Sequence, residues 1–318
     1  MKTTSPFETS GLHTVLGASG ASGIALVKEL KKRELKIRAV QRSACSIEGV
    51  ETAQANLLDS KETANAINGS SYVYMCAAVE YKTSSWQSNW PLMMKNTIEA
   101  CLQNNAVLIF LDNIYMYGPS PLTVPFDERH SQFPPSKKGQ VRKHVANMVL
   151  EAVNEKKLKA VIARSADFYG PNAKNSMFYI STLDRMLEGK GPQSIAKPGI
   201  LHTFANTTDN ATAMVSLALD PTTYGQVWHL PVGKPIKPEE LISMINKELG
   251  KDYKISFLPP FMRRVLSLFI PALKETEEML YQFENDYVMS WEKLKKQFPE
   301  LEATSYPEGI REMIASFR

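Results

Sequence analysis

Three glycines at regular spacing give the clearest chemical signal in this 318-residue chain. Gly17, Gly20 and Gly23 lie between an apolar run and an amphipathic stretch, in HTVLGASGASGIALVKEL. The first glycine permits a tight turn, the second lets the backbone approach a pyrophosphate, and the third lets helix and strand pack closely. The free N–H groups of the following helix favour phosphate, so the loop predicts a dinucleotide site rather than only a tight turn. The remaining loop residues in this site are Ser19, Ala21 and Ser22.

The end of the next apolar run bears on which dinucleotide is bound. An acidic residue about 20 positions after the glycines would hold the adenosine ribose of NAD. Here the run places neutral Gln41 and cationic Arg42 at that point. A cation suits the 2′-phosphate of NADP, so we expect NADP with NAD as the alternative, although an arginine at a strand end can also be merely solvated.

The composition indicates a globular protein without a nucleic-acid surface. The chain is 43% hydrophobic and 22% charged, and its net charge of +4 is too mild for a strongly basic face. Its three cysteines follow no disulfide or metal-ligand spacing, so we expect a reducing compartment and no metal site. Residues 1–11 lack the apolar core of a signal peptide, and the apolar stretch 265–273 is too short to span a bilayer. These features predict a cytoplasmic protein with no membrane partner.

The pattern of apolar residues predicts the elements that position these motifs. Short apolar runs alternate with amphipathic stretches through the first half, which is typical of βαβ units around a parallel sheet. We expect strands at 13–16, 35–40, 51–55, 72–77, 107–111 and 160–164, and helices at 24–32, 92–104 and 138–155. Asp209 is expected to cap a helix that ends near 219, and 227–230 to form a further strand. Residues 261–273 are expected to form a core helix, a lid or a dimer surface.

These elements predict an α/β fold. It comprises a Rossmann-type doubly wound parallel sheet with a smaller C-terminal substrate lobe. The dinucleotide-binding domain is expected to cover 1–165, with 205–230 returning to it. The substrate lobe is expected to comprise 166–204 and 231–318.

Several motifs together resemble the extended or atypical short-chain dehydrogenases/reductases of the NAD-dependent epimerase/dehydratase type. GASGASG resembles the family's TGxxGxxG loop, and RSADFYGPN (164–172) resembles its R-P-x-x-x-Y-G-P run at the entry to the substrate lobe. HTFANTTDNATAMV (202–215) resembles the H-V-x-D segment. More narrowly, DNIYMYGP, KGxxR and ENDYVMSWEKL resemble an uncharacterised bacterial branch of this family that lacks YxxxK.

The resemblance implies further contacts with the cofactor. ANLLD (55–59) resembles the adenine-contacting segment, with an amide where an aspartate is usual, and CAAVE (76–80) resembles the strand end whose backbone faces the ribose. A helix asparagine completes the set. The implied cofactor residues are Asn56, Leu57, Cys76, Ala77, Ala78 and Asn96.

Two departures from the family leave the proton-transfer group open. The catalytic tyrosine and lysine of the family lie in YxxxK, where the lysine lowers the pKa of the tyrosine. No tyrosine here has a lysine four positions later, and either Lys138-x-x-x-Arg142 or Gly139-x-x-x-Lys143 stands in that place. Asp112 begins the pair that replaces the family's Ser-Ser/Thr.

One replacement is cationic. Arg142 or Lys143 would contact the cofactor ribose, while Lys138 would assist a substrate anion. These cations begin a predicted helix, where positive charge opposes the helix dipole, and a bound anion would offset that cost. An arginine stays charged and can only orient, whereas a buried lysine can act as a base. Lysines that are simply solvated on a loop are the alternative.

The other replacements are a tyrosine or an aspartate. Tyr115, Tyr117 and Tyr169 are the candidate tyrosines, since they follow strands at the edge where substrates bind, although each can instead be a packed wall residue. Asp112 can act as acid or base beside the nicotinamide, or can cap a loop. Tyr169, Asn175 and His202 are expected to contact the substrate.

The function predicted from these residues and from the resemblance is hydride transfer between NADP(H) and a carbonyl or alcohol carbon of a small molecule, with a nucleotide-linked or otherwise anionic sugar as the candidate substrate. The alternative is a dinucleotide-binding sensor that has lost catalysis, because YxxxK is replaced. Family members often dimerise through two sheet-covering helices, so a homodimer through 92–104 and 138–155 is a further expectation.

Overall fold

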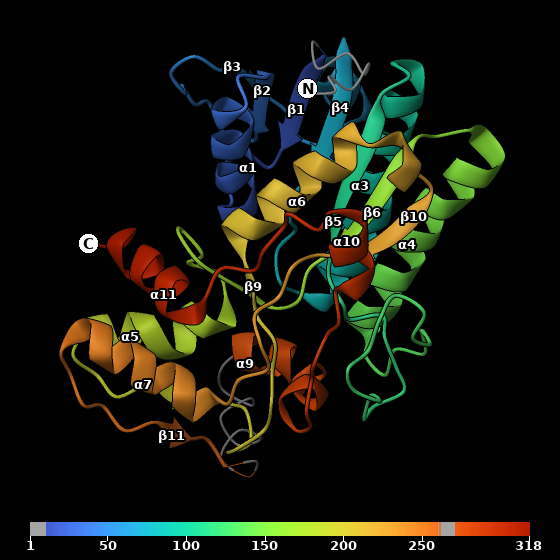
Figure 1. Cartoon of the computed structure of the whole chain (residues 1–318). Coiled ribbons are helices and arrows are strands. Elements are labelled where there is room, and N and C mark those ends of the chain that lie inside the picture. Colours follow the sequence, from blue (N-terminus) through green and yellow to red (C-terminus); the bar gives the residue numbers. More distant parts are fainter. Residues whose placement is uncertain (1–10, 260, 262–270) are drawn as a thin grey trace.

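The computed structural model describes residues 11–259, 261 and 271–318, and its main body is one parallel sheet (Figure 1). Seven strands pair in the order β10-β6-β5-β4-β1-β2-β3. They are β1 (Leu12–Leu16), β2 (Lys36–Gln41), β3 (Glu51–Gln54), β4 (Ser70–Met75), β5 (Val107–Asp112), β6 (Ala160–Arg164) and β10 (Gln226–His229). The order reverses between β1 and β4, which is where open α/β sheets bind ligands. The predicted Rossmann-type sheet is confirmed.

Helices cover both faces of this sheet, because each carries one apolar stripe. Helices α1 (Ala21–Lys32) and α6 (Thr207–Leu219) pack together on one face, and α6 crosses in front of the sheet in Figure 1. The other face is covered by α2 (Ser60–Ile67), α3 (Thr83–Gln103) and α4 (Lys137–Lys156). In the described part of the chain, no helix combines the length and the apolar character needed to cross a membrane.

A smaller lobe lies below the sheet in Figure 1 and has a separate apolar core. Ala21, at the start of α1, packs against that core, so the lobe adjoins the glycine loop. Its short strands pair as β7 with β9 and β8 with β11. The elements outside the main sheet and its covering helices are β7 (Phe168–Tyr169), the π-helix η1 (Tyr179–Leu183), α5 (Asp184–Leu187), β8 (Gln193–Ser194), β9 (Ala205–Asn206), the 3-10 helix η2 (Pro221–Thr223), α7 (Pro238–Leu249), β11 (Ser256–Phe257), α9 (Pro271–Glu277), the 3-10 helix η3 (Leu280–Phe283), α10 (Glu292–Gln297) and α11 (Tyr306–Ala315).

Two expectations about this part of the chain need correction, and a third falls on residues that are mostly not described. The segment 231–318 does not lie wholly in the lobe, because α10 packs against β10 and Leu294 joins the core beneath the sheet. Asp209 does not cap α6. Asn206 does, by accepting the N–H of Thr208, while the Asp209 carboxylate binds the N–H and hydroxyl of Thr304 at 2.7 and 2.6 Å. Most of the helix expected at 261–273 lies outside the described residues.

The helix predicted at 92–104 begins earlier than expected. Helix α3 starts at Thr83 and contains Pro91. Its first half is helical because Trp86 and Trp90 bury their rings in the core between α3, α4 and the sheet. This tertiary packing outweighs the local cost of the proline.

Candidate functional site

The glycine loop has the geometry that its spacing predicts. Gly17 has a φ of +87°, and a Cβ there would lie 2.6 Å from the backbone of Ala77. A Cβ on Gly23 would lie 2.2 Å from the carbonyl oxygen of Gly17. These two glycines therefore close the turn against the neighbouring strand and seat α1 against the loop.

Gly20 differs because the space above it is open. A Cβ at this position would meet only the Gly17 carbonyl oxygen, at the ordinary distance of 3.5 Å, and its φ of −76° is allowed for any residue. Gly20 is exposed, and it precedes α1 without any side-chain cap or acidic residue in the first turn. The first-turn N–H groups are thus free for an anion, which fits the phosphates of a dinucleotide.

The adenosine end of the expected cofactor site carries one cation. Arg42 is exposed directly after β2, and the Gln54 amide fixes the backbone there by donating to the Arg42 carbonyl oxygen at 2.7 Å. No hydrogen bond or ion pair joins the Arg42 guanidinium to another described residue, and Gln41 beside it is half-buried. This arrangement leaves a positive charge available where a 2′-phosphate would lie.

The asparagines implied by the family resemblance have different surroundings. Asn96 is buried and donates to the Leu57 carbonyl oxygen at 3.0 Å, so it positions the loop after β3. The side-chain oxygen of Asn56 accepts the N–H of Leu58 at 3.1 Å, which closes a local turn at the surface. Asn96 therefore acts on the cofactor region through Leu57, and Asn56 presents its remaining amide N–H groups to solvent.

The end of β4 forms the second wall of the glycine loop. The Cys76 N–H donates to the Leu16 carbonyl oxygen at 2.9 Å, which ties the two strand ends together. Burial raises the pKa of the Cys76 thiol, so this residue stays a neutral wall group. Ala77 contacts Gly17 closely, and Ala78 is exposed beside it.

Asp112 is enclosed by two arginines. Its Oδ1 lies 2.5 Å from Arg142 Nη2, and its Oδ2 lies 3.3 Å from Arg164 Nε. All three side chains are at most 3% exposed, and the Arg142 guanidinium also stacks on the Trp90 ring at 4.2 Å. The expected ribose contact of Arg142 and the expected acid–base role of Asp112 both need correction, because each group faces a protein partner away from solvent.

Tyr117 is likewise enclosed. Its hydroxyl lies 2.6 Å from His229 Nε2 and accepts a hydrogen bond from Arg164 Nη1 at 2.8 Å. Burial raises the pKa of Tyr117 to about 12 and lowers the pKa of His229 to about 3. Because the ring of Tyr117 is fully buried, its expected catalytic role is replaced by a role in this interior network.

Lys138 binds carboxylates of the lobe rather than open solvent. Its Nζ lies 2.8 Å from Glu275 Oε2 and 2.9 Å from Glu278 Oε1, and it donates to Thr83 Oγ1 at 2.8 Å. The hydrogen bond from Lys138 lowers the pKa of Glu275 to about 2. The expected role of Lys138 toward a substrate anion is thus corrected, since the side chain is fully buried among protein acceptors.

Lys143 also has partners of its own. Its Nζ donates to the Gln132 carbonyl oxygen at 2.7 Å and lies over the Phe133 ring. Lys138, Arg142 and Lys143 are therefore all bound to protein groups, and none of them is free to contact a ribose. The expected cationic site is therefore not assembled in this structure.

A group of tyrosines lies at the same edge of the sheet with less enclosure. Tyr115 follows β5 and is half-buried, and its phenol interacts with that of Tyr81, which follows β4 and is 39% exposed. Trp86 stacks on Tyr115 with an interplanar angle of 13°. Burial raises the pKa of Tyr115 well above its ordinary value, so its phenol stays protonated and can donate a proton. Gly139 permits this arrangement, because a Cβ there would lie 2.4 Å from the Tyr115 carbonyl oxygen.

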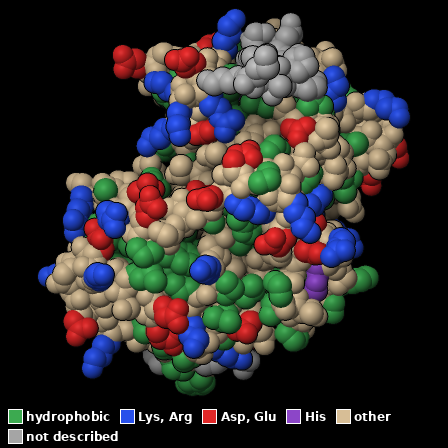
Figure 2. All heavy atoms as spheres, viewed as in Figure 1, with side chains coloured by type: hydrophobic (Ala, Val, Ile, Leu, Met, Phe, Trp, Pro, Cys, Tyr) green, Lys and Arg blue, Asp and Glu red, His purple; other side chains and the backbone are tan. Residues whose placement is uncertain are grey.

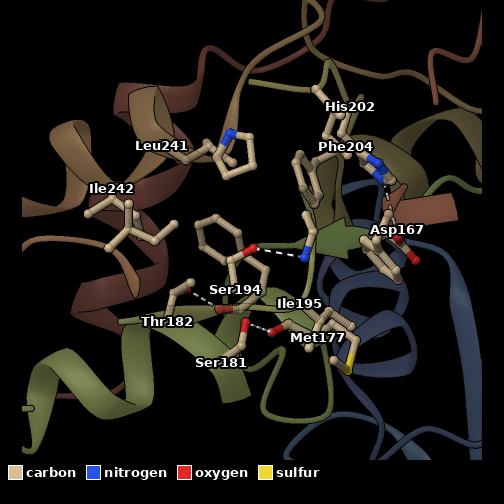
Figure 3. A pocket seen from close by; sticks show the side chains of 16 residues that line it. Asp167, Met177, Ser181, Thr182, Ser194, Ile195, His202, Phe204, Leu241 and Ile242 are labelled. Atoms are coloured by element: carbon tan, nitrogen blue, oxygen red, sulfur yellow. Dashed lines mark hydrogen bonds and ion pairs between the residues drawn. The ribbon is translucent and has the colours of Figure 1, made fainter. Parts of the chain in front are cut away.

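The lobe contains a small cavity of about 60 Å³ (Figure 3). His202 and Asp167 lie together on one side of it, with Nε2 and Oδ2 3.1 Å apart. Two other residues expected to contact the substrate lie elsewhere. Tyr169 is 1% exposed in the lobe core, and Asn175 is exposed at the surface. The expectation for Tyr169 is corrected, while His202 remains a predicted substrate residue.

Sequence reasoning missed three groups that shape this site. Asp167 lies within the RSADFYGPN run, and Tyr81 directly follows CAAVE, so both were close to recognised motifs. Glu275 carried no signal, because its partner Lys138 is 137 positions away. Among the described residues, His, Cys, Asp and Glu side chains form no group of three or more that could hold a metal ion.

Comparison with known proteins agrees with this geometry. A family model described as the NAD dependent epimerase/dehydratase family matches residues 13–226. No curated protein sequence matches the chain. Among solved structures, a UDP-glucose 4-epimerase from Thermus thermophilus in complex with NAD is 20% identical, with a TM-score of 0.75 over 96% of this chain and 99% of that one.

Two further structures have the same fold. A UDP-glucuronic acid 4-epimerase from Bacillus cereus in complex with NAD is 16% identical, with a TM-score of 0.77 over 96% of this chain and 98% of that one. An epimerase from Methanothermobacter thermautotrophicus is 13% identical, with a TM-score of 0.82 over 97% of this chain and 92% of that one. These likenesses concern the fold, whereas the family model spans most of the chain. The protein belongs to the NAD-dependent epimerase/dehydratase family.

Proposed function

We propose that the protein transfers hydride reversibly between a nicotinamide dinucleotide and a carbonyl or alcohol carbon of a small molecule. The observation that carries the proposal is the open space above Gly20, at a helix N-terminus that has neither a side-chain cap nor an acidic first turn. Family membership and the NAD present in similar structures support it. When bound, the dinucleotide would supply the hydride chemistry, while the chain binds and orients the reactants.

NADP is the form of the cofactor that we propose. The exposed guanidinium of Arg42 follows β2, and no carboxylate stands at Gln41 to hold the ribose hydroxyls of NAD. Arginine recognises phosphate through paired N–H donors, so this position favours a 2′-phosphate. NAD remains the alternative, and it is the form named for the similar structures.

Tyr115 is the proton donor that we propose for the reaction. A carbonyl oxygen that receives hydride at its carbon gains negative charge, and a protonated phenol can transfer a proton to that oxygen. Burial raises the pKa of Tyr115, so the phenol keeps its proton. Trp86 covers one side of the ring, which limits the access of water there.

The substrate and the assembly are two further predictions. The expected nucleotide-linked sugar rests on the likeness to UDP-sugar epimerases, whereas the lining of the lobe cavity, which includes no lysine or arginine among its described residues, does not favour it. The face shown in Figure 2 has Lys and Arg interspersed with Asp and Glu, so this face presents no continuous basic patch of the kind that binds nucleic acid. A homodimer through α3 and α4 stays a prediction, which sedimentation of the purified protein would test.

Thermal unfolding with each cofactor tests the proposal. NADPH should raise the melting temperature, and by more than NADH does, because a ligand that binds only the folded state stabilises it by mass action. An absorbance screen at the nicotinamide band, with simple carbonyls and sugar nucleotides, then tests turnover. The absence of any shift with either cofactor would reject dinucleotide binding.

A dinucleotide-binding sensor is the second candidate. It is favoured by one observation, namely that the residues standing in the place of YxxxK are bound to protein groups. A sensor would bind NADPH without turning over any compound of the screen, and Tyr115→Phe would then leave NADPH binding unchanged. Turnover that is lost in Tyr115→Phe with NADPH binding retained would identify an enzyme.

A further inference from the structure

The side chains that line the lobe cavity bear on the chemical class of the substrate, whereas the glycine loop bears only on the cofactor. Its walls are mainly aliphatic and aromatic side chains, among them Phe178, Phe204, Leu241 and Ile242 (Figure 3). Such a surface gains free energy by excluding water from apolar groups of a ligand. The cavity therefore fits a compact apolar body.

The serine and threonine hydroxyl groups in this lining are hydrogen-bonded to the backbone of the protein. Ser181 and Thr182 each donate to the backbone carbonyl oxygen four positions earlier, and the Ser194 hydroxyl accepts the N–H of Ala196 at 3.1 Å. Figure 3 shows these bonds running from the side chains to the neighbouring backbone. Recognition of a polar ligand group thus falls mainly to His202 and Asp167.

His202 and Asp167 present hydrogen-bond acceptors. An ionised carboxylate can only accept, so the proton between them lies on His202 Nε2. His202 Nδ1 is buried with no partner in the described part of the chain, and it is an acceptor when the ring carries only the Nε2 proton. The second carboxylate oxygen of Asp167 also has no hydrogen bond to a described residue. A buried acceptor without a partner is costly, so a ligand donor here would be favourable.

The charge of the cavity has one sign. Asp167 is the only charged residue among the described residues of the lining, which include no lysine or arginine. A diphosphate placed here would bring further negative charge against the Asp167 carboxylate, in a lining that has no lysine or arginine among its described residues. We propose that the substrate of this site is a small, largely apolar compound that is neutral or cationic, and that offers a hydroxyl or ammonium donor to Asp167 and His202.

This inference rests on the proposed function, because it names the substrate class of the same site. Asp167 connects the cavity to the reaction site, since it follows β6 at the edge of the sheet where β5 leads to Tyr115. Its negative charge also contributes to raising the pKa values of Tyr81 and Tyr115. A substrate held in the cavity would thus reach toward the phenol.

Three ligands with one apolar body test the proposal: pentylamine, pentan-1-ol and pentanoate, titrated into the full-length protein by NMR. Pentylamine and pentan-1-ol should bind. Pentanoate should bind at least about tenfold more weakly, because Asp167 repels its carboxylate. Asp167→Asn keeps the shape and the bond to His202, and should remove the preference for ammonium over carboxylate. UDP-glucose should not compete with pentylamine.

Two variants locate the binding. Ala196→Leu fills the cavity and should weaken the binding of pentylamine and pentan-1-ol by about tenfold, since it removes the space for their chain. Lys197→Leu, at the exposed neighbouring position, should leave both affinities unchanged. Equal binding of pentanoate and pentylamine, displacement by UDP-glucose, or no binding of any of the three would overturn the proposal.

NADPH binding is measured in the same samples, so this inference and the proposed function can fail separately. If the protein bound pentylamine, lost that binding in Ala196→Leu and did not bind NADPH, the ligand class of the cavity would stand and the proposed hydride transfer would be rejected. NADPH binding with no alkyl ligand bound would retain the cofactor site and reject the substrate class.

Discussion

Lys138 of α4 and Glu275 of α9 form an ion pair, with Nζ and Oε2 2.8 Å apart, across the junction between the sheet and the lobe. Glu275 also accepts the N–H of Thr83, at the start of α3, and Glu278 accepts the N–H of Lys137, at the start of α4. Glu275 and Glu278 thus bind backbone N–H groups at two helix N-termini, and both pair with the Lys138 ammonium on one of these helices. This explains why α4 tolerates positive charge at the end that disfavours it.

Removal of Lys138 should weaken the junction between the lobe and the sheet. Lys138→Ala leaves two carboxylates and a hydroxyl without their buried donor, so we expect the free energy of unfolding to fall by about 1–3 kcal/mol. Lys137→Ala, on the exposed side of the same turn, should change it by less than about 0.5 kcal/mol. Urea unfolding measures both. A Lys138→Ala protein of unchanged stability but with a raised KM would instead place this lysine at the substrate.

Asp112→Asn should destabilise the protein strongly. The substitution leaves Arg142 and Arg164 buried without a counter-charge, and breaking one side of a buried ion pair costs about 3–5 kcal/mol. Asp127→Asn, in an ion pair with the largely exposed Arg129, should cost less than about 1 kcal/mol. If Asp112→Asn folded as stably as the wild type and only lost turnover, the aspartate would be catalytic after all.

Two buried histidines should make the protein less stable in mild acid. Burial lowers the pKa of His13 from 6.5 to about 4 and that of His229 to about 3, so the folded state keeps both neutral while the unfolded chain takes up protons. The two neutral histidines therefore leave the free energy of unfolding unaffected above pH 6.5. That free energy falls as the pH drops from 6.5 toward the folded-state pKa values. Each should cost about 2 kcal/mol of stability between pH 7 and 5.

Urea unfolding at the two pH values checks this dependence. His229→Gln, which can still bond Tyr117, should be less stable at pH 7 but should lose only about half as much stability on acidification. If the free energy of unfolding of His229→Gln fell between pH 7 and 5 by as much as that of the wild type, His229 would not be a group that takes up its proton on unfolding.

Arg42 should decide between the two cofactors. Arg42→Ala removes the exposed guanidinium after β2, and should lower the affinity for NADPH by about tenfold while leaving that for NADH nearly unchanged. Lys36→Ala, which removes a cation at the opposite end of β2, is the matched control and should alter neither affinity. Equal losses for both cofactors in Arg42→Ala would argue against a 2′-phosphate contact.

Tyr115→Phe should abolish turnover without loss of cofactor binding. A positioned proton donor contributes about 10²–10⁴ in rate, so kcat should fall by a factor in that range while the dissociation constant of NADPH stays the same. Tyr117→Phe provides the contrast, because that hydroxyl bonds His229 and Arg164 in the interior. It should lower stability and leave most of the activity of the folded enzyme intact.

The cofactor loop could be predicted because its chemistry is local. Gly17, Gly20 and Gly23 follow one another between a strand and a helix, so their spacing alone defines the turn. The strands of the sheet were likewise visible as buried apolar runs, and β6 is buried at every position. Periodicity and turn chemistry act within a few residues, which is the range that one sequence reveals.

The catalytic region could not be predicted in the same way, because its contacts join distant parts of the chain. The charge on Lys138 indicated an anion, but the anion is Glu275 of the lobe rather than a ligand. Arg142 similarly turns inward to Asp112, 30 positions earlier. A cation in a sequence motif can indicate an anion nearby, and only the fold shows whether protein, ligand or solvent faces it.

The most direct test of cofactor binding is calorimetric titration of NADPH into Gly20→Ala. An added Cβ at Gly17 or Gly23 would collide with the protein itself, whereas one at Gly20 enters only the space assigned to the pyrophosphate. We expect Gly20→Ala to keep its stability within about 0.5 kcal/mol of the wild type and to bind NADPH at least about tenfold more weakly. Wild-type affinity in this folded variant would contradict the dinucleotide site.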